Sequence, residues 1–132
     1  MDLTTQYAFG KTVDMPCIEA QQKVRQELAR EGFGVLTEID VSKTFSEKLR
    51  KEFRDYVILG ACNPHIAYEA INKEINLGIL LPCNIVIYTR DDGKTAVMFI
   101  DPIARFSTIG NSDIEEFGIN VTQKLERVLD AI

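Results

Sequence analysis

Apolar and polar residues follow two different rhythms in the first quarter of the chain. From residue 3 to residue 9 they alternate with a period of two, which predicts a strand that continues toward Val13. After Pro16 the apolar period becomes that of an α-helix, and Gly32 is expected to end this helix. The apolar stripe of the predicted helix comprises Cys17, Ala20, Val24 and Leu28.

Residues 33–41 predict a second strand with two unlike faces. Because side chains alternate along a strand, Glu38 and Asp40 would share one face with Leu36. Two carboxylates would then stand about 7 Å apart on the same side of the sheet. The opposite face would carry Phe33, Val35, Thr37, Ile39 and Val41.

The middle of the chain predicts two helix starts around one buried strand. Thr44 and Glu47 have the spacing of a capping box, so a short helix is expected over residues 44–53. Residues 56–62 are apolar on both faces, which is typical of a buried strand. Asn63-Pro64 then provides a cap and a proline suited to the first helical position.

The last third of the chain predicts a hairpin followed by a long helix. Residues 83–89 and 94–100 read as strands, and the Asp-Gly step within residues 90–93 is a hairpin turn signal. Ser112 and Glu115 form a second capping box. The helix that follows has apolar residues at helical spacing: Ile114, Phe117, Val121, Leu125, Val128 and Ile132.

This order of elements favours an α+β fold with one domain over residues 1–132. Hairpins mixed with crossovers indicate a mostly antiparallel sheet, with the main helices packed on one face. A chain of 132 residues is long enough to bury one core without a second domain.

Charge and composition narrow the classes of partner. The net charge is −5 and the basic residues are dispersed among acids, which disfavours nucleic acid as a partner. No secretory leader and no apolar run long enough to span a membrane is found, so the chain is expected in the cytoplasm, with no membrane partner. Three cysteines without a disulfide spacing are expected to be free thiols.

Two turns carry the most distinctive chemistry. Cys62 and Cys83 are each followed by asparagine, as Asn63 and Asn84, and each turn contains a proline. If the two strands are neighbours, both thiols and both amides would line one pocket. A thiol beside the helix start at Pro64 would have a lowered pKa, whereas the alternative is that both cysteines are small packing residues.

No cofactor, metal or catalytic motif is identified. Zinc sites usually combine two closely spaced Cys or His pairs, and one Cys62-x-x-His65 spacing does not predict one. There is no glycine-rich phosphate loop and no serine-centred elbow. Glu38 and Asp40 could be a binding pair or simply the solvated face of a strand.

Three segments together resemble domain-of-unknown-function family 302: residues 31–40, 58–64 and 80–84. Lys48, Phe53-Arg54, Ala67-Tyr68 and Asp101-Pro102 also fit the pattern of that family. Asp55 departs from it, since proline is expected there, and residues 103–106 are not mapped.

The resemblance implies a layout like that of the TATA-binding protein, with a curved antiparallel sheet and helices on one side, and it implies homodimers. It implies no established reaction, and the fold analogy does not imply nucleic-acid binding. By position it singles out Glu38, Asp40, Lys48, Cys62, Asn63, Pro64, Cys83 and Asn84 as ligand-binding residues.

Three functions remain open at this point. The first is a small-ligand-binding or sensing module whose pocket combines the two Cys-Asn turns with the acidic strand. The second is a thiol redox protein that uses Cys62 as nucleophile and Cys83 as its partner. The third is a structural homo-oligomerisation domain, in which the cysteines are only packing residues. A homodimer is expected because both faces of the sheet carry apolar residues, as in Val86 and Tyr88 opposite Ile85 and Ile87.

Overall fold

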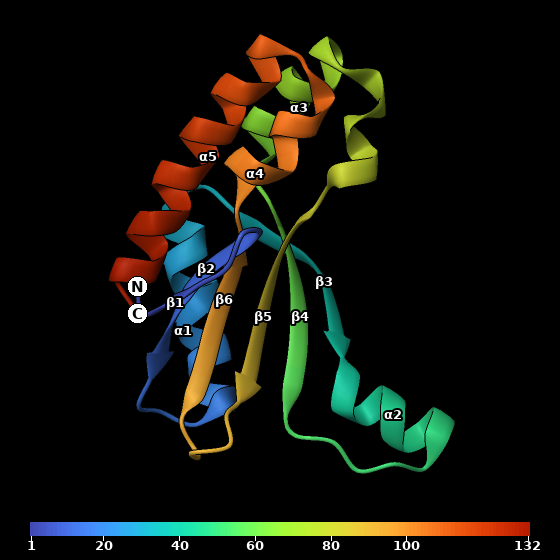
Figure 1. Ribbon diagram of the computed structural model, residues 1–132, viewed down its shortest axis with the longest axis vertical. Coiled ribbons are helices and arrows are strands. Elements are labelled where there is room, and N and C mark those ends of the chain that lie inside the picture. Colours follow the sequence, from blue (N-terminus) through green and yellow to red (C-terminus); the bar gives the residue numbers. More distant parts are fainter.

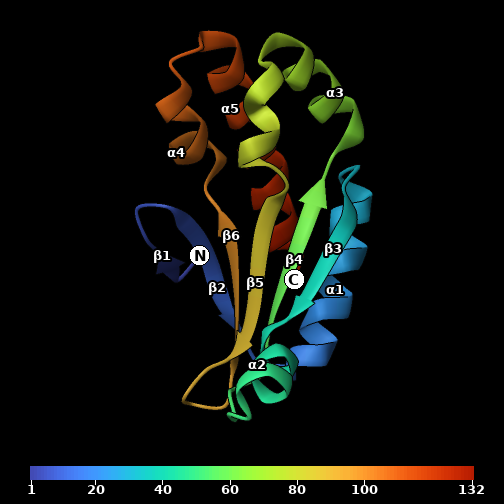
Figure 2. The ribbon, with the colours of Figure 1, turned by 90° about the vertical axis from the view of Figure 1, so that its right-hand side faces the viewer.

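The computed structural model describes all residues from 1 to 132 and contains one six-stranded antiparallel sheet. The strands lie in the order β1-β2-β6-β5-β4-β3, and the sheet is open and curled (Figures 1 and 2). The strand bounds are β1 Leu3–Thr4, β2 Ala8–Val13, β3 Gly34–Asp40, β4 Tyr56–Cys62, β5 Cys83–Thr89 and β6 Thr95–Ile100.

Helices cover one face of the sheet and one end of its strands. The two long helices α1 and α5 lie on the same face, while α3, α4 and two 3₁₀ turns gather beyond one end of the strands (Figure 1). The short helix α2 stands at the opposite end. The bounds are α1 Cys17–Arg30, α2 Val41–Leu49, α3 Pro64–Lys73, η1 Ile75–Leu80, α4 Pro102–Phe106, η2 Ser107–Ile109 and α5 Ser112–Asp130.

The main core lies between the sheet and the two long helices. Nineteen buried residues form one cluster, in which Leu59, Ile85 and Phe99 from the central strands meet Leu28 of α1 and Leu125 of α5. Each of these five side chains is fully buried, which contributes about 1.5–3 kcal/mol apiece. The α+β architecture, the antiparallel sheet and the helices on one face are confirmed.

A smaller cluster joins the elements beyond the strand ends. Ala70 of α3, Leu77 of η1, Phe106 of α4 and Ile114 of α5 pack together there. This second core holds the helical end of the molecule against the sheet, and the cavity described below lies between the two cores.

Three expectations about local structure are wrong. The first strand is interrupted, because the chain turns over residues 5–7 and β1 pairs back onto β2. The helix α2 begins at Val41 rather than Thr44, because the Asp40 side chain accepts from the Lys43 amide at 2.9 Å and caps it earlier. The cap of α5 is likewise Asn111, one residue before Ser112.

The face assignment of β3 is also partly wrong. The pairing with β4 shifts between Val35 and Thr37, a β-bulge that places an extra residue, Leu36, in the strand. Val35 therefore packs against the main core, while Thr37 faces the uncovered side and lies close over Gly60. Glu38 and Asp40 do share one face, as the period of two predicts, and that face is the one covered by the helices.

Candidate functional site

The Cys-Asn turns meet at the helical end of the sheet. Ala61 near the end of β4 is the pairing partner of Cys83 at the start of β5, so Cys62 lies one residue beyond the partner of Cys83. Both cysteines line one cavity between the strand ends and the surrounding helices. Three of the four residues of the two Cys-Asn turns thus belong to one lining, and Asn84 does not.

This thiol cavity is small and almost entirely apolar. Twelve of its thirteen lining residues are hydrophobic, and its volume is about 30 Å³, room for about one water molecule. Sites for drug-sized ligands occupy about 300–1,000 Å³. The cavity therefore cannot hold a metabolite without rearrangement of its helices. Its lining is Phe33, Ala61, Cys62, Asn63, Ile66, Ala67, Ala70, Leu77, Leu81, Cys83, Phe106, Phe117 and Val121.

Asn63 is the only polar residue in this lining, and its amide is occupied by the fold. Its Oδ1 accepts from the Ile66 backbone amide at 3.3 Å, which caps α3, with Pro64 in the first turn. Its Nδ2 donates to the Glu31 carbonyl at 3.3 Å, which joins the turn after α1 to the start of α3. Gly32, at φ 85°, lies so close that an added Cβ would be 3.1 Å from Nδ2.

The thiols do not have the low pKa expected beside a helix start. Burial raises the pKa of Cys62. Burial, followed by the proximity of Cys62, raises the pKa of Cys83 to about 11. Desolvation of the thiolate thus outweighs the dipole of α3, and neither thiol is activated as a nucleophile at neutral pH.

Asn84 and the acidic pair do not join this cavity. Asn84 is exposed and faces the uncovered side of the sheet, opposite Gly60. Glu38 and Asp40 lie near the far end of β3, where Asp40 pairs with Val57; the cysteine end of β3 is six residues, about 20 Å, away. The predicted site residues therefore occupy separate places rather than one pocket.

At their own end, the two carboxylates line a polar hollow beside the start of α1. Both already have partners in the protein. Glu38 pairs with Arg25 Nη2 at 3.1 Å, and Asp40 accepts from the Ser42 hydroxyl at 2.8 Å as well as capping α2. Those hydrogen bonds, led by the Lys43 amide, lower the pKa of Asp40.

The largest apolar concavity among the main hollows lies on the uncovered face, next to α2. This α2 groove has a volume of about 500 Å³, within the range of small-molecule sites, and six of its seven lining residues are hydrophobic. It is formed by the end of β3, by α2, by the loop after α2 and by β4. The lining residues are Ile39, Val41, Thr44, Phe45, Phe53, Tyr56 and Ile58.

Three aromatic rings line the α2 groove, and a fourth, Tyr88, continues the row beside it. The rings of Phe45 and Phe53 meet edge to face at 5.2 Å, and Phe53 lies 6.0 Å from Tyr56. Tyr56 stacks on Tyr88 of β5 at 5.4 Å. Phe53 remains 46% exposed, so the groove presents aromatic surface to whatever enters it. Burial raises the pKa of Tyr56, which keeps its hydroxyl a neutral hydrogen-bond donor.

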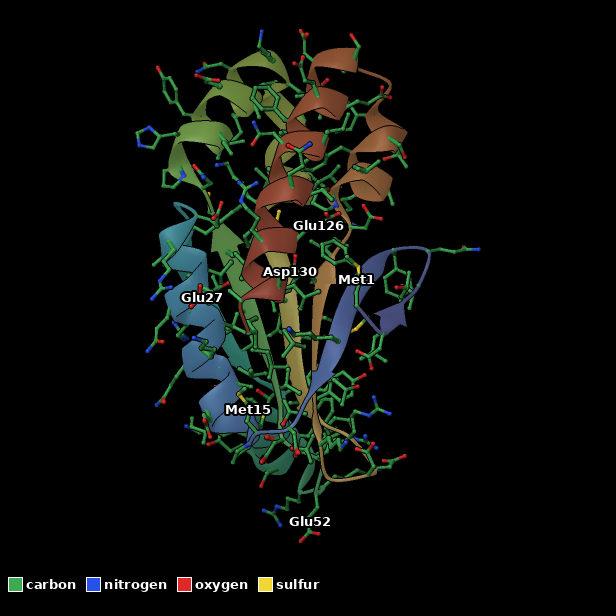
Figure 3. All side chains as sticks on the ribbon, turned by 90° about the vertical axis from the view of Figure 1, so that its left-hand side faces the viewer. Met1, Met15, Glu27, Glu52, Glu126 and Asp130 are labelled. Atoms are coloured by element: carbon green, nitrogen blue, oxygen red, sulfur yellow. The ribbon has the colours of Figure 1, made fainter.

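The segment that forms this groove is basic, although the whole chain is acidic. Residues 41–54 carry five basic and two acidic residues, a net charge of +3 in a chain of net charge −5. Lys48 lies one helical turn after Thr44, on the same side of α2 as the groove lining. The loop reaches the tip of the molecule at Glu52 (Figure 3).

Sequence reasoning found Lys48 but missed the aromatic residues around it. Their signal was present in the sequence, since Val41, Phe45 and Leu49 recur at a spacing of four in a helix that buries none of its residues. An amphipathic helix without a buried face has an apolar side that needs a partner.

The structure shows no cluster of three His, Cys, Asp or Glu residues that could hold a metal ion. None of its helices is both long and apolar enough to cross a bilayer.

Comparison with known proteins gives a family but no activity. The family model described as "Domain of unknown function DUF302" matches residues 9–132. A crystal structure of an uncharacterized conserved protein DUF302 from Bacillus stearothermophilus superposes with a TM-score of 0.90 at 26% sequence identity, covering 96% of this chain and 98% of that one. No curated protein matches the sequence.

Proposed function

The chain belongs to the DUF302 family, and we propose that it is a small-ligand-binding module whose binding site is the α2 groove. The observation that carries the proposal is the combination, on one segment, of a 500 Å³ apolar groove and a surplus of positive charge. The ligand class is an amphipathic organic anion, with an aromatic or branched apolar body and a carboxylate, sulfonate or phosphate group.

The apolar body of such a ligand fits the floor of the groove. Phe53 and Ile39, exposed by 46% and 49%, would lose their contact with water, at about 25 cal/mol for each Å² covered. Stacking on an aromatic ring adds about 0.5–1.5 kcal/mol. Tyr56 supplies a neutral donor for a polar atom of the ligand.

The anionic group would be attracted by cations that the fold leaves free. Lys48, Arg50 and Lys51 have no acidic partner within 4.0 Å, whereas Arg54 of the same segment is paired with Asp91 at 2.7 Å. Pairing with a free cation at the groove margin would give salt-dependent affinity and would orient the ligand.

Arg50 adds a structural reason to regard this segment as functional. It ends α2 in the left-handed region at φ 53°, and it is the one residue other than glycine with a positive φ. Glycine is the residue usually found at such a helix end, and a side chain there costs about 1 kcal/mol. Arginine is thus present at a position where local stability favours glycine.

The redox alternative has less support, since burial raises the pKa of both thiols at the helical end. A ligand pocket made by the Cys-Asn turns together with Glu38 and Asp40 is disfavoured by their separation along β3. Residence in the cytoplasm remains part of the proposal, supported by the three free cysteines.

We also propose that the chain forms a homodimer through the uncovered face of the sheet. Val86, Tyr88 and Met98 are only half-buried on this face, and no helix covers it. These central residues lie beside the α2 groove rather than in it, so one dimer interface and one ligand site can coexist on the face.

The test uses 8-anilino-1-naphthalenesulfonate, a fluorescent aromatic anion, with dodecanoate as a competitor. We expect one saturable site per chain, weakened about tenfold by Phe53→Ala and by Lys48→Glu, because each removes roughly 1.4 kcal/mol of contact or charge attraction. Tyr68→Ala on α3 and Lys124→Glu on α5 are matched controls on other surfaces, and they should leave binding unchanged.

Equal weakening by the control variants, or no saturable binding, would refute the groove as the site. If a second copy of the chain filled the groove, it would compete with the dye, and the apparent dye affinity would fall as the protein concentration rises. That result would also count against the proposed ligand.

A further inference from the structure

We propose that the chain docks reversibly onto an anionic lipid bilayer through the α2 tip, which we define as residues 46–55. These residues form the second half of α2 and the loop after it, and every one of them is exposed. The α2 tip stands at the end of the molecule opposite α3 and α4 (Figures 1 and 2). It adjoins the α2 groove, but the inference requires no ligand in that groove.

Two apolar side chains of the α2 tip remain largely exposed. Leu49 is 58% exposed and Phe53 is 46% exposed. Leu49 lies one turn after Phe45 on the apolar side of α2, yet it does not line the α2 groove. The groove therefore gives no reason for a leucine at this position. A helix with one apolar side and otherwise polar faces can lie in the bilayer interface with that side toward the acyl chains.

Three cations stand directly beside these apolar residues. Lys48 precedes Leu49, and Arg50 and Lys51 follow it. The salt bridges of this segment involve Lys43 and Arg54 and leave those three residues unpaired. Their hydrocarbon stems can lie along apolar surface while the charged heads reach lipid phosphates. Each basic residue close to an anionic bilayer strengthens binding about fivefold.

The distribution of charge favours this partner over others. Residues 41–54 carry +3 in a chain of net charge −5, so the rest of the chain carries −8. An anionic bilayer attracts the α2 tip and repels the remaining surface, which orients the protein. Nucleic acid would attract the same cations but would leave Leu49 in water. A stable protein interface takes about 20–30 residues from each side, more than the α2 tip contains.

The expectation of no membrane partner rested on the lack of a spanning segment, and a surface contact needs none. Glu52 opposes the proposed attraction and therefore allows a test of opposite sign. This residue lies at the extremity of the molecule (Figure 3). The other acid within residues 41–54, Glu47, is 4.0 Å from Lys43. Glu52→Gln should thus strengthen bilayer binding about fivefold.

The test uses the absence of tryptophan from the chain. Leu49→Trp places a single fluorophore on the α2 tip, and Tyr68→Trp places one at an exposed position of α3 as its control. With phosphatidylcholine vesicles containing about 30% phosphatidylserine at about 0.1 M salt, the emission of Leu49→Trp should shift to shorter wavelength. The emission of Tyr68→Trp should not shift. Vesicles of phosphatidylcholine alone, or about 1 M salt, should abolish the shift.

Vesicle flotation measures the affinity of variants without the fluorophore. Lys51→Glu changes the charge by two and should weaken binding about 30-fold, whereas Lys124→Glu on α5 should keep the affinity of the wild type. Leu49→Ser should weaken binding about tenfold, because the leucine no longer leaves water. Since Leu49 lies outside the α2 groove, Leu49→Ser should bind 8-anilino-1-naphthalenesulfonate as the wild type does.

Absence of binding to the anionic vesicles at about 0.1 M salt would overturn the inference, and the dye result for the α2 groove would stand apart from it. Equal weakening by Lys51→Glu and Lys124→Glu would overturn it as well. Binding to soluble polyglutamate, with no emission shift of Leu49→Trp on vesicles, would assign the α2 tip to an acidic protein partner instead.

Discussion

Replacement of Asn63 by alanine should destabilise the protein by about 2 kcal/mol, twice the cost of losing an ordinary helix cap. The cap itself, accepted from the Ile66 amide, accounts for about 1 kcal/mol. The second bond, donated to the Glu31 carbonyl, accounts for about 1 kcal/mol more, because Asn63 is 9% exposed and water cannot fully replace the lost donor.

The assay is urea unfolding followed by circular dichroism, with a thermal scan as a second readout. With an unfolding entropy of about 2.1 cal/mol/K per residue, a loss of 2 kcal/mol should lower the midpoint temperature by about 7 °C. Asn63→Asp separates the two bonds, since aspartate keeps the acceptor for Ile66 but has no donor for Glu31. We expect it to cost about 1 kcal/mol.

Asn84→Val is the matched comparison at the other Cys-Asn turn. Asn84 is exposed in a strand, where valine is intrinsically favoured, so this variant should be neutral or slightly more stable. An Asn63→Ala variant within about 0.5 kcal/mol of the wild type would refute the reasoning. A strongly destabilised Asn84→Val would refute it equally, by showing that the exposed amide has a structural partner.

Three further outcomes are expected. Arg50→Gly should raise the free energy of unfolding by about 1 kcal/mol and weaken dye binding in the groove. Arg50→Ala should weaken dye binding without raising the free energy of unfolding. An Arg50→Gly variant less stable than the wild type would contradict the strain at φ 53°. Burial raises the pKa of Cys83 from 9.0 to about 11 on folding, so the free energy of unfolding should keep its full value below pH 9 and fall by roughly 2–3 kcal/mol as the pH rises to 11. In urea unfolding measured across this pH range, Cys83→Ala should lack that part of the fall. Sedimentation equilibrium at micromolar concentration should show a dimer; only the 14.9 kDa species would contradict the proposed pairing of open faces.

Most of the fold could be predicted because local signals and tertiary packing agree. Asn63-Pro64 does start a helix, and the apolar period after Ser112 does become the core-facing stripe of α5. Where two capping residues compete, the sequence alone does not decide between them. Asp40 caps α2 four residues before the predicted cap Thr44, and Asn111 caps α5 one residue before the predicted cap Ser112.

The β-bulge at Leu36 was beyond a period-two argument. One inserted residue reverses the faces on either side of it, so Val35 and Thr37 point to opposite sides although alternation places them together. Nothing in the residue types marks the insertion; it follows from the pairing with β4.

The candidate site was also predicted only in part, because residue chemistry does not show which residues the fold brings together. Residue chemistry brought Cys62 and Cys83 to attention, and both residues belong to the lining of one cavity. The same chemistry grouped Asp40 with them, although the length of β3 keeps it about 20 Å away. The α2 groove depends on exposed apolar residues such as Phe53. The sequence alone does not separate such residues from core residues, because only the fold shows which apolar side chains remain exposed.

The central claim, that the α2 groove binds an amphipathic organic anion, is tested most directly by chemical-shift mapping. Titration of ¹⁵N-labelled protein with 8-anilino-1-naphthalenesulfonate should move the amide resonances of residues 39–45 and 53–58 and leave those of α3 and α5 in place. Shifts confined to the helical end around Cys62 and Cys83, or shifts spread evenly over the chain, would contradict the account.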